Sequence, residues 1–455
     1  MRKVVVAGVV TPRGLGDALQ CCVTVKLLNN LLSEADITLM CPDLKNGLFV
    51  FKNLNINANF VDLNPAGYLV LWRLLRSSLI NRHKSGNEKM KAMKRKVNQL
   101  KMYSRIIKTA KKVYEKYFTF YSIDKFISSG FLRSFKFDAG IIGGHTLSEP
   151  IYRCIVEYDI ISSVVNGSLV MSPISISKVG LEHFGQKTSI FKRTLMIKRL
   201  RRSLQRFDFI YTRGPQSLEI LRDYLGINEQ KIGVALDSGF GLRLIHNSPA
   251  TSKTLKREKR RIIIVPRKDY FYIYDRKDLY PLYLNTLTEF ILWLYENFDC
   301  EIVLSSQNIV SNVIHDLLHV LRRRKNDSYS KLLQVVIPKN LVEAYELYDS
   351  SDIVVTSRMH GGISALSLGV PALFVLPLVD TKVLDILLFL GLDINSFSVD
   401  MFDADALKSE NIVNKIGNVL ENLDYYKKTV EAAVNKALPT LELPVKTLIN
   451  LLEKR

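Results

Sequence analysis

Residues 352–371 read DIVVTSRMHGGISALSLGVP, and this stretch decides how the chain folds. The β-branched run near its start is typical of a strand that is buried on both faces of a parallel sheet. After a short turn, a helical pattern continues to Gly369-Val370-Pro371, where glycine and proline end it. The apolar run ALFVLPL (372–378) follows directly. The order strand, helix, strand predicts a βαβ unit.

The same alternation recurs along most of the chain. Apolar runs that predict strands include KVVVAGVV (3–10), ADITLMCP (35–42), FDAGIIGG (137–144), FDFIYTRG (207–214), RIIIVPRK (261–268) and CEIVLSS (300–306). Residues 246–261, HNSPATSKTLKREKRR, are polar and aperiodic, which predicts a linker. We therefore expect an N-terminal α/β domain over 1–245 and a C-terminal α/β domain with C-terminal helices over 262–455. Two Rossmann-like domains that face each other make a GT-B-like fold, whose ligand binds at the carboxyl ends of the strands.

A basic segment interrupts the first predicted domain at about 70–136. Residues 82–116 are rich in Lys and Arg and contain only Glu88 and Glu115 as acids, with apolar residues at helical spacing. The pattern predicts a basic helical insertion. It is compatible with a solvated helical face or, because tyrosines lie among the lysines, with peripheral contact to an anionic membrane. Nucleic acid ranks third, since no nucleic-acid-binding motif is present.

The overall composition points to a soluble cytoplasmic protein that attracts anions. Of 455 residues, 64 are Lys or Arg and 44 are Asp or Glu, a formal net charge of +20. The odd number of cysteines (Cys21, Cys22, Cys41, Cys154 and Cys300) and their spacing favour reduced thiols and give no zinc pattern. No signal peptide and no stretch of 18 apolar residues is expected, and no metal site is predicted.

The turn from Ser357 to Gly362 is the strongest candidate for a binding site. The start of a helix presents free backbone N–H groups and a positive dipole. Arg358 adds a planar fork suited to a carboxylate or phosphate, and His360 adds a group that titrates near neutral pH. Gly361 and Gly362 are expected to keep the turn open to a ligand. Alternatively, Arg358 only pairs with a carboxylate and His360 only fills the helix terminus.

The block TSRMHGGISALSLGVPALFVLPLVDTK (356–382) resembles the C-terminal signature of the polysaccharide pyruvyl transferase family. Further similar blocks occur in the same order. They are the glycine turn that ends in Gly16-Asp17, IIGGHTLSEP (141–150), the strand that ends in Tyr211-Thr212-Arg213, and VALDSGFGL (234–242) with Asp237.

The resemblance implies an enzyme that transfers a pyruvyl group from phosphoenolpyruvate to a sugar of a cell-surface glycan or a lipid-linked precursor, without a further cofactor. His360 would be the general acid or a phosphate ligand, and Asp17, or less favourably Asp237, would be the base. The donor-binding candidates are Arg358, Arg213, Ser357, Gly361 and Lys382. The acceptor-binding candidates are Gly14, Gly16 and His145.

Several of these residues also have plain structural readings. Asp17 can cap a helix, Arg213 can neutralise nearby acids, Lys382 can be an exposed lysine, and His145 can be a loop residue without a function. The chain also departs from the family pattern. Leu15 stands where the family often has Asn, and His145 stands where it often has a third glycine.

Two other functions fit parts of the pattern. A GT-B glycosyltransferase that uses a nucleotide sugar would share the glycine turn and the two-domain plan. A non-catalytic basic protein would bind membranes or nucleic acid through residues 82–116. The sequence does not determine the acceptor sugar, its linkage or the oligomeric state.

Overall fold

The computed structural model describes most of the chain outside one long segment. The described residues are 2–8, 15–41, 58–62, 136–143, 146–147, 151–177, 181, 190–245, 258–306, 312–325 and 333–455. The predicted basic helical insertion at about 70–136, including residues 82–116, lies outside this part, as does most of the predicted linker 246–261. The glycine turn before Leu15 also lies outside it.

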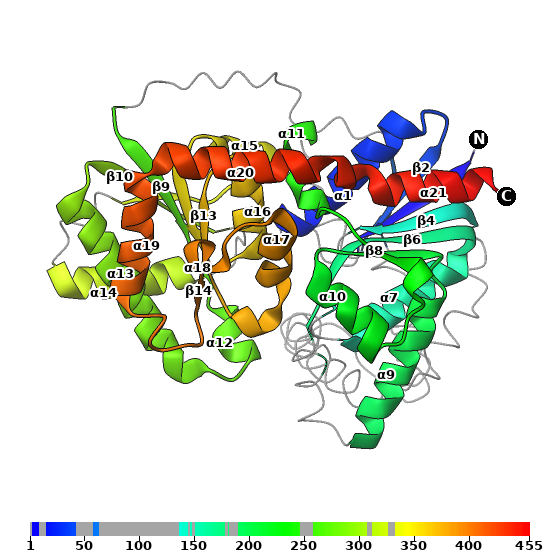
Figure 1. The fold of residues 1–455 in the computed structure, drawn as a ribbon, viewed down its shortest axis with the longest axis horizontal. Coiled ribbons are helices and arrows are strands. Elements are labelled where there is room, and N and C mark those ends of the chain that lie inside the picture. The colour runs from blue at the N-terminus through cyan, green and yellow to red at the C-terminus, as the bar shows by residue number, and fades with distance from the viewer. Residues whose placement is uncertain are drawn as a thin grey trace, which may run out of the picture. The chain divides into compact units, whose positions relative to one another are not determined.

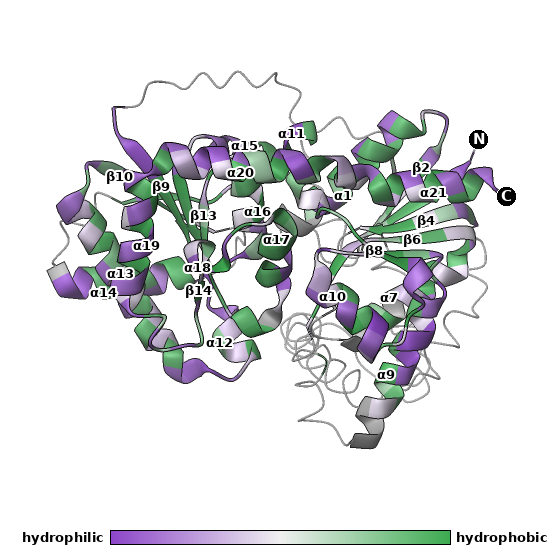
Figure 2. Ribbon diagram, in the orientation of Figure 1, coloured by the Kyte–Doolittle hydropathy of each residue, from purple (hydrophilic) through white to green (hydrophobic). Residues whose placement is uncertain are grey.

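The first half of the chain forms a parallel sheet. Its strands are β1 (Lys3–Gly8), β2 (Asp36–Cys41), β3 (Asn59–Asp62), β4 (Phe137–Gly143), β5 (Thr146–Leu147), β6 (Val165–Ile176), β7 (Phe209–Thr212) and β8 (Ile232–Val234). The order across the sheet is β3-β2-β1-β4-β6-β7-β8, with β5 beside β6 (Figure 1). Most buried residues of these strands are apolar, as Figure 2 shows for β4, because helices cover a parallel sheet on both faces.

Helices connect the strands of this sheet. They are α1 (Leu15–Leu31), α7 (Ile151–Val164), α9 (Ile190–Gln205), α10 (Pro215–Glu219), which continues as a π-helical turn over Ile220–Tyr224, and α11 (Leu242–Ile245). None of the elements expected from the sequence falls on α7. Proline stands at the first position of α10, where its missing N–H has no helical partner to lose.

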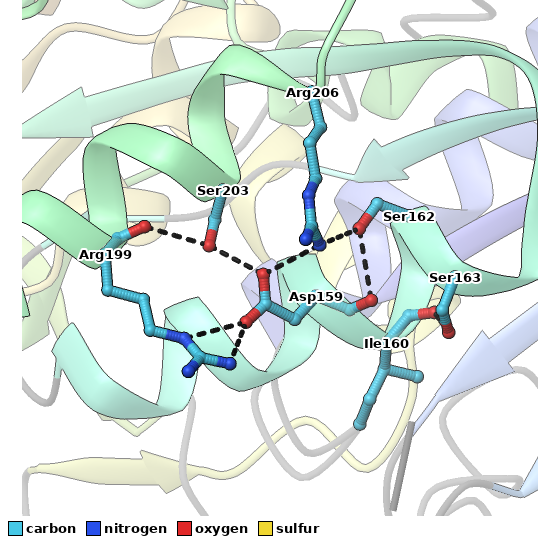
Figure 3. Close-up of polar contacts among 7 residues, drawn as sticks. All are labelled: Asp159, Ile160, Ser162, Ser163, Arg199, Ser203 and Arg206. Atoms are coloured by element: carbon cyan, nitrogen blue, oxygen red, sulfur yellow. Dashed lines mark hydrogen bonds and ion pairs between the residues drawn. The ribbon is translucent and has the colours of Figure 1, made fainter. Parts of the chain in front are cut away.

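Asp159 joins helices α7 and α9 (Figure 3). Its carboxylate is 2% exposed and accepts hydrogen bonds from Arg199 Nη2 (2.9 Å), Ser203 Oγ (2.7 Å) and Arg206 Nη1 (3.1 Å). A buried carboxylate is stable only when its charge is balanced and its lone pairs are occupied. The cluster therefore fixes the inner face of the basic helix α9 and has a structural role.

The second half of the chain forms a 6-stranded parallel sheet. Its strands are β9 (Arg260–Val265), β10 (Cys300–Ser305), β11 (Gln334–Val336), β12 (Ile353–Thr356), β13 (Ala372–Leu376) and β14 (Ser398–Asp400), in the order β11-β10-β9-β12-β13-β14. In the register of β9 and β12, Val265 pairs with Thr356. The carboxyl ends of these two central strands are therefore level with each other.

The helices of the second half of the chain mostly pack around this sheet. They are α12 (Asp269–Ile273), α13 (Tyr280–Asn297), α14 (Val313–Lys325), α15 (Leu341–Asp349), α16 (Met359–Ser367), α17 (Lys382–Leu390), α18 (Ile394–Phe397), α19 (Ser409–Glu421), α20 (Leu423–Ala437) and α21 (Leu443–Glu453). Helix α17 ends at Gly391, whose φ of 70° is the left-handed conformation that glycine adopts at helix ends. No helix in the described ranges is both long and apolar enough to span a membrane.

The last helix returns to the first sheet. Helix α20 contacts α16 and α17, whereas α21 contacts β4 and β6. Thr447 of α21 shares a hydrogen bond of 2.7 Å with the hydroxyl of Tyr211 in β7, and Thr440 Oγ1 accepts from the backbone N–H of Leu236 at 3.0 Å. The C-terminal segment thus supports the sheet that carries Arg213 and Asp237.

Candidate active site

The turn between β12 and α16 is held by its own side chains. Arg358 is the N-cap residue of α16 in an extended conformation, and its carbonyl accepts from the N–H of Gly361 at 3.1 Å. Thr356 Oγ1 accepts from the N–H of Arg358 and donates to its carbonyl, both at 2.9 Å. Ser357 Oγ shares a hydrogen bond of 2.7 Å with the hydroxyl of Tyr283. These bonds fix the backbone and leave the Arg358 side chain uninvolved in the turn.

Gly362 has a packing role that the sequence did not reveal. A Cβ at this position would overlap the ring of Phe374 in β13. Gly362 therefore lets α16 approach the sheet closely, and this contact, rather than access for a ligand, requires a glycine there. Gly361 is buried in the first turn of the same helix.

Arg358 has buried N–H groups that nothing in the described part of the chain accepts. Its Nε and Nη2 atoms are inaccessible to solvent and have no hydrogen-bond partner there. Burial, together with the neighbouring charge of Arg267, lowers the pKa of Arg358 to about 10, so the guanidinium remains charged at neutral pH. A buried charged group without hydrogen bonds is costly. The predicted pairing of Arg358 with a carboxylate of the protein is not seen among these residues.

His360 lies one residue further along the same helix start. Its Nε2 atom is buried and also lacks a hydrogen-bond partner within the described ranges. Burial lowers the pKa of His360 to about 4, against the raising effect of Asp237, and the charges of Arg213, Lys382 and Arg267 lower it further. The imidazole is therefore neutral at pH 7 in the protein without a bound anion. An anion placed among these cations would raise its pKa.

Arg213 and Asp237 form a buried ion pair. They are both 1% exposed, and Arg213 Nε donates to Asp237 Oδ2. Gln20 Nε2 of α1 donates to both oxygens of the same carboxylate at 2.9 and 2.8 Å, and the N–H of Gly239 donates at 2.7 Å. Burial alone would raise the pKa of Asp237, but Arg213, His360 and these hydrogen bonds lower it. Asp237 is thus an ionised anchor for Arg213 and a poor proton acceptor.

The structure adds Arg267 to the predicted set. This residue follows β9 by two positions, and its guanidinium carbon lies 4.1 Å from the ring centroid of Tyr270. Lys382 Nζ lies 5.9 Å from the centroid of the same ring. The charges of both residues act on His360. The run RIIIVPRK showed basic residues at a strand end, but nothing in the sequence placed them beside the turn of Arg358.

Lys382 owes its position to an unusual residue before it. Thr381 is not a glycine, yet its φ of 49° lies in the left-handed region, and it caps the start of α17. This conformation costs an L-residue about 1 kcal/mol. The Thr381 hydroxyl donates to the carbonyl of Ile176 at the end of β6 at 2.8 Å, which holds the strained residue in place. Strain of this kind is concentrated at functional sites.

Asp385 joins α17 to the start of α10, and we call these contacts the α10–α17 junction. Its Oδ1 atom accepts from the backbone N–H groups of Gln216 (3.0 Å) and Ser217 (3.2 Å), and its Oδ2 accepts from the Ser217 hydroxyl. A Cβ at Gly214 would overlap the backbone of Asp385. Burial raises the pKa of Asp385 to about 6, although these donors and Arg213 lower it.

The remaining predicted residues are placed only in part. Gly16 and Asp17 lie in the first turn of α1, which begins at Leu15, and the side chain of Asp17 is not described. Gly14 and His145 lie outside the described residues. The structure therefore brings together Arg213, Arg358, His360 and Lys382 with the added Arg267. In this cluster cations outnumber the acids Asp237 and Asp269, an arrangement suited to a small multiply charged anion.

Several solved structures share the architecture of this chain. The chain superposes on S. aureus MnaA in complex with UDP with a TM-score of 0.54 at 12% identity, covering 94% of this chain and 91% of that one. For sucrose-phosphate synthase from Thermosynechococcus elongatus the TM-score is 0.52 at 10% identity, covering 100% of both chains. For UGT73P12 of Glycyrrhiza uralensis it is 0.53 at 8% identity, covering 100% of this chain and 96% of that one. The predicted GT-B-like fold is confirmed.

The chain thus has a GT-B-like fold that carries a cluster of cationic side chains. A family model for polysaccharide pyruvyl transferases matches residues 15–377, from the start of α1 to the end of β13. The chain belongs to the polysaccharide pyruvyl transferase family and is a transferase. A search of curated proteins finds no match to the chain. The family assignment confirms the resemblance seen in residues 356–382.

Proposed function

We propose that this enzyme transfers the pyruvyl group of phosphoenolpyruvate to two hydroxyls of one sugar in a cell-surface glycan or its precursor. The observation that carries this proposal is a set of buried nitrogen atoms at the start of α16, Arg358 Nε and Nη2 and His360 Nε2, which have no hydrogen-bond partner among the described residues. Phosphoenolpyruvate holds a carboxylate and a phosphate a few bonds apart. Such a donor would occupy these atoms and balance the surrounding cations.

The proposed reaction needs one proton added to the donor and one proton removed from the attacking sugar hydroxyl. A proton adds to the methylene carbon of phosphoenolpyruvate, and a sugar hydroxyl attacks the resulting cationic carbon and loses its own proton. A second hydroxyl of the sugar then replaces the phosphate at that carbon, which leaves as inorganic phosphate with the second proton. The product is a cyclic ketal, and the first sugar proton balances the one gained by the methyl group.

We assign the first proton transfer to His360. With no anion bound, its pKa of about 4 leaves the ring neutral at pH 7. The negative charges of the donor would offset the effect of Arg213, Arg267 and Lys382, raise this pKa, and allow the ring to become a general acid once the donor is bound. If His360 is instead a phosphate ligand, its neutral Nε2–H would donate to a donor oxygen.

Asp17 is the proposed base for the attacking hydroxyl. What supports this role is its backbone position in the first turn of α1, three residues before Gln20, whose side chain binds Asp237. Asp237 itself is occupied by three donor groups and has a lowered pKa, so its role is to hold Arg213. Gly14, Gly16 and His145 remain proposed acceptor contacts.

The test is stabilisation of the enzyme by its donor. A ligand that binds only the folded state raises the melting temperature by mass action. We expect phosphoenolpyruvate to stabilise the wild type and the control Arg324→Ala, a variant of an exposed arginine paired with Glu289, but not Arg358→Ala. Phosphate release that requires both phosphoenolpyruvate and an acceptor sugar would then establish transfer. Stabilisation by a nucleotide sugar alone would instead establish a glycosyltransferase.

Contact with an anionic membrane at the cytoplasmic face is a separate part of the proposal. It would bring the enzyme to lipid-linked acceptors, and it rests on the basic residues 82–116 of the sequence. Binding of the purified protein to vesicles with and without anionic lipid, before and after deletion of this segment, tests it. Equal binding to both kinds of vesicle would refute it.

A further inference from the structure

We propose that Arg267 is a third donor-binding arginine and that Tyr270 is the residue that positions it. The proposal rests on the proposed function, because the ligand is the same phosphoenolpyruvate. Arg267 would bind the donor together with Arg358, from the neighbouring strand of the sheet, and Lys382, which also lies near Tyr270, would contribute a further charge.

The sheet register places Arg267 beside Arg358. Val265 pairs with Thr356 across β9 and β12, and each arginine follows its strand residue by two positions. Two further bonds tie the turns together. The N–H of Ser357 donates to the carbonyl of Val265 at 2.9 Å, and Tyr283 OH accepts from the N–H of Arg267 at 3.2 Å while it bonds Ser357 Oγ.

Tyr283 therefore acts as a fixed bridge between the two turns. Its ring is fully buried, and burial raises the pKa of its hydroxyl to about 12, so it stays protonated. The hydroxyl reaches the backbone of Arg267 on one side and the residue before Arg358 on the other. The two arginines thus start from a rigid common frame, which is what a site for a small bidentate anion requires.

Tyr270 then fixes the direction of the Arg267 side chain. The ring is 3% exposed, belongs to the single-turn helix α12, and carries the Arg267 guanidinium at 4.1 Å. Lys382 Nζ lies 5.9 Å from the same ring. An aromatic face attracts both cations. It therefore holds two like charges near each other that would repel without the ring or an anion.

A purely structural role does not account for the charge around Arg267. The ion pair between Arg267 and Asp269 is 3.4 Å long, and the Asp269 carboxylate is half exposed. An ion pair of this kind contributes little to the stability of the folded protein. Instead, the Arg267 charge lowers the pKa of both Arg358 and His360. Arg267, Arg358 and Lys382 are three positive charges kept close to one another. Such an arrangement is favourable only when an anion binds among them.

The experiment compares Arg267→Ala with Arg276→Ala. The control also removes an arginine that lies over an aromatic ring, because the Arg276 guanidinium carbon is 5.6 Å from the centroid of Phe402. We expect Arg267→Ala to raise KM for phosphoenolpyruvate by about 10- to 100-fold with a smaller change in kcat, the range for loss of one charge-assisted contact. Arg276→Ala should leave KM within about twofold.

Tyr270 is tested by a conservative pair. Tyr270→Phe keeps the aromatic face and should retain the wild-type KM, whereas Tyr270→Leu should raise KM as Arg267→Ala does. The melting temperature of each variant without ligand shows whether it is folded, and Arg267→Lys, which keeps the charge but not the fork, should give an intermediate KM. A wild-type KM in both Arg267→Ala and Tyr270→Leu would overturn the inference.

The inference and the proposed function can fail separately. If phosphoenolpyruvate neither stabilises nor is consumed by the wild type, the proposed function is overturned and the inference with it. If the wild type uses phosphoenolpyruvate and Arg358→Ala does not, while Arg267→Ala matches the wild type, only the inference is overturned.

Discussion

Asp385 offers the most direct test of the electrostatics of this fold. Its carboxyl group is 0% exposed, and burial raises its pKa from the ordinary 3.8 to about 6. One pKa unit corresponds to 1.36 kcal/mol, so the ionised form is disfavoured by about 3 kcal/mol relative to the unfolded chain. Because the pKa is higher in the folded state, the stabilisation is present below pH 3.8 and is lost as the pH rises through 6.

Asp385→Asn should remove this dependence. The amide oxygen can still accept from the N–H groups of Gln216 and Ser217, but it never ionises. We therefore expect the free energy of unfolding of the variant, relative to that of the wild type, to rise by about 3 kcal/mol between pH 4 and pH 8. An unfolding entropy of about 2.1 cal/mol/K per residue makes this roughly 3 °C in melting temperature for the whole chain. Thermal denaturation of both proteins at a series of pH values measures the difference.

Asp385→Ala is the control. It leaves the two N–H groups of the α10–α17 junction without an acceptor and should lower the melting temperature at every pH, because an unpaired buried donor costs about 1–3 kcal/mol. A difference between Asp385→Asn and the wild type that does not change with pH would refute the assignment of a raised pKa to Asp385.

Three further predictions concern the site and its support. Arg213→Met should lower the free energy of unfolding by about 3–5 kcal/mol, because it leaves the Asp237 carboxylate buried without its ion-pair partner. Urea denaturation should show that adding Asp237→Asn recovers part of this loss. An equal loss in the single and double variants would contradict the pairing. Phosphoenolpyruvate should bind the wild type more tightly as the pH falls from 7 to 5, because the bound anion raises the pKa of His360 and binding then takes up a proton. Calorimetry in two buffers of different ionisation enthalpy should show less proton uptake in His360→Gln. Identical uptake in both proteins would exclude His360 as its source. Gly362→Ala should lower the free energy of unfolding by about 1–3 kcal/mol, because its methyl group overlaps the Phe374 ring, and Phe374→Leu should restore part of the loss. A wild-type melting temperature for Gly362→Ala would show that α16 is free to shift.

The sequence predicted the elements whose signals are local. The strands β9, β10, β12 and β13 were each marked by a run of apolar residues, because a strand buried on both faces needs apolar residues along most of its length. The stop after α16 was equally clear. Helix α7 was missed, since it ends at Val164 and β6 begins at Val165 with no breaker between them. The short strand β14 was missed because its three residues do not form an apolar run.

The candidate site was predicted only where one segment contains it. Ser357, Arg358 and His360 lie within a single motif, so their proximity follows from the chain itself. Arg267 is 91 positions away from Arg358 in sequence, and only the parallel register of β9 and β12 places the two arginines side by side.

The sequence by itself therefore determined the α/β class, the family resemblance and the α16 motif, because periodicity and motifs are properties of neighbouring residues. Only the tertiary structure decided which long-range partners each polar group takes. It paired Arg213 with Asp237 and placed Asp385 on the N–H groups of α10. It left Arg358 and His360 with buried atoms that find no hydrogen-bond partner in the part of the chain that the structure describes. The reason is that burial and hydrogen bonding depend on what surrounds a side chain in space, which no local pattern specifies.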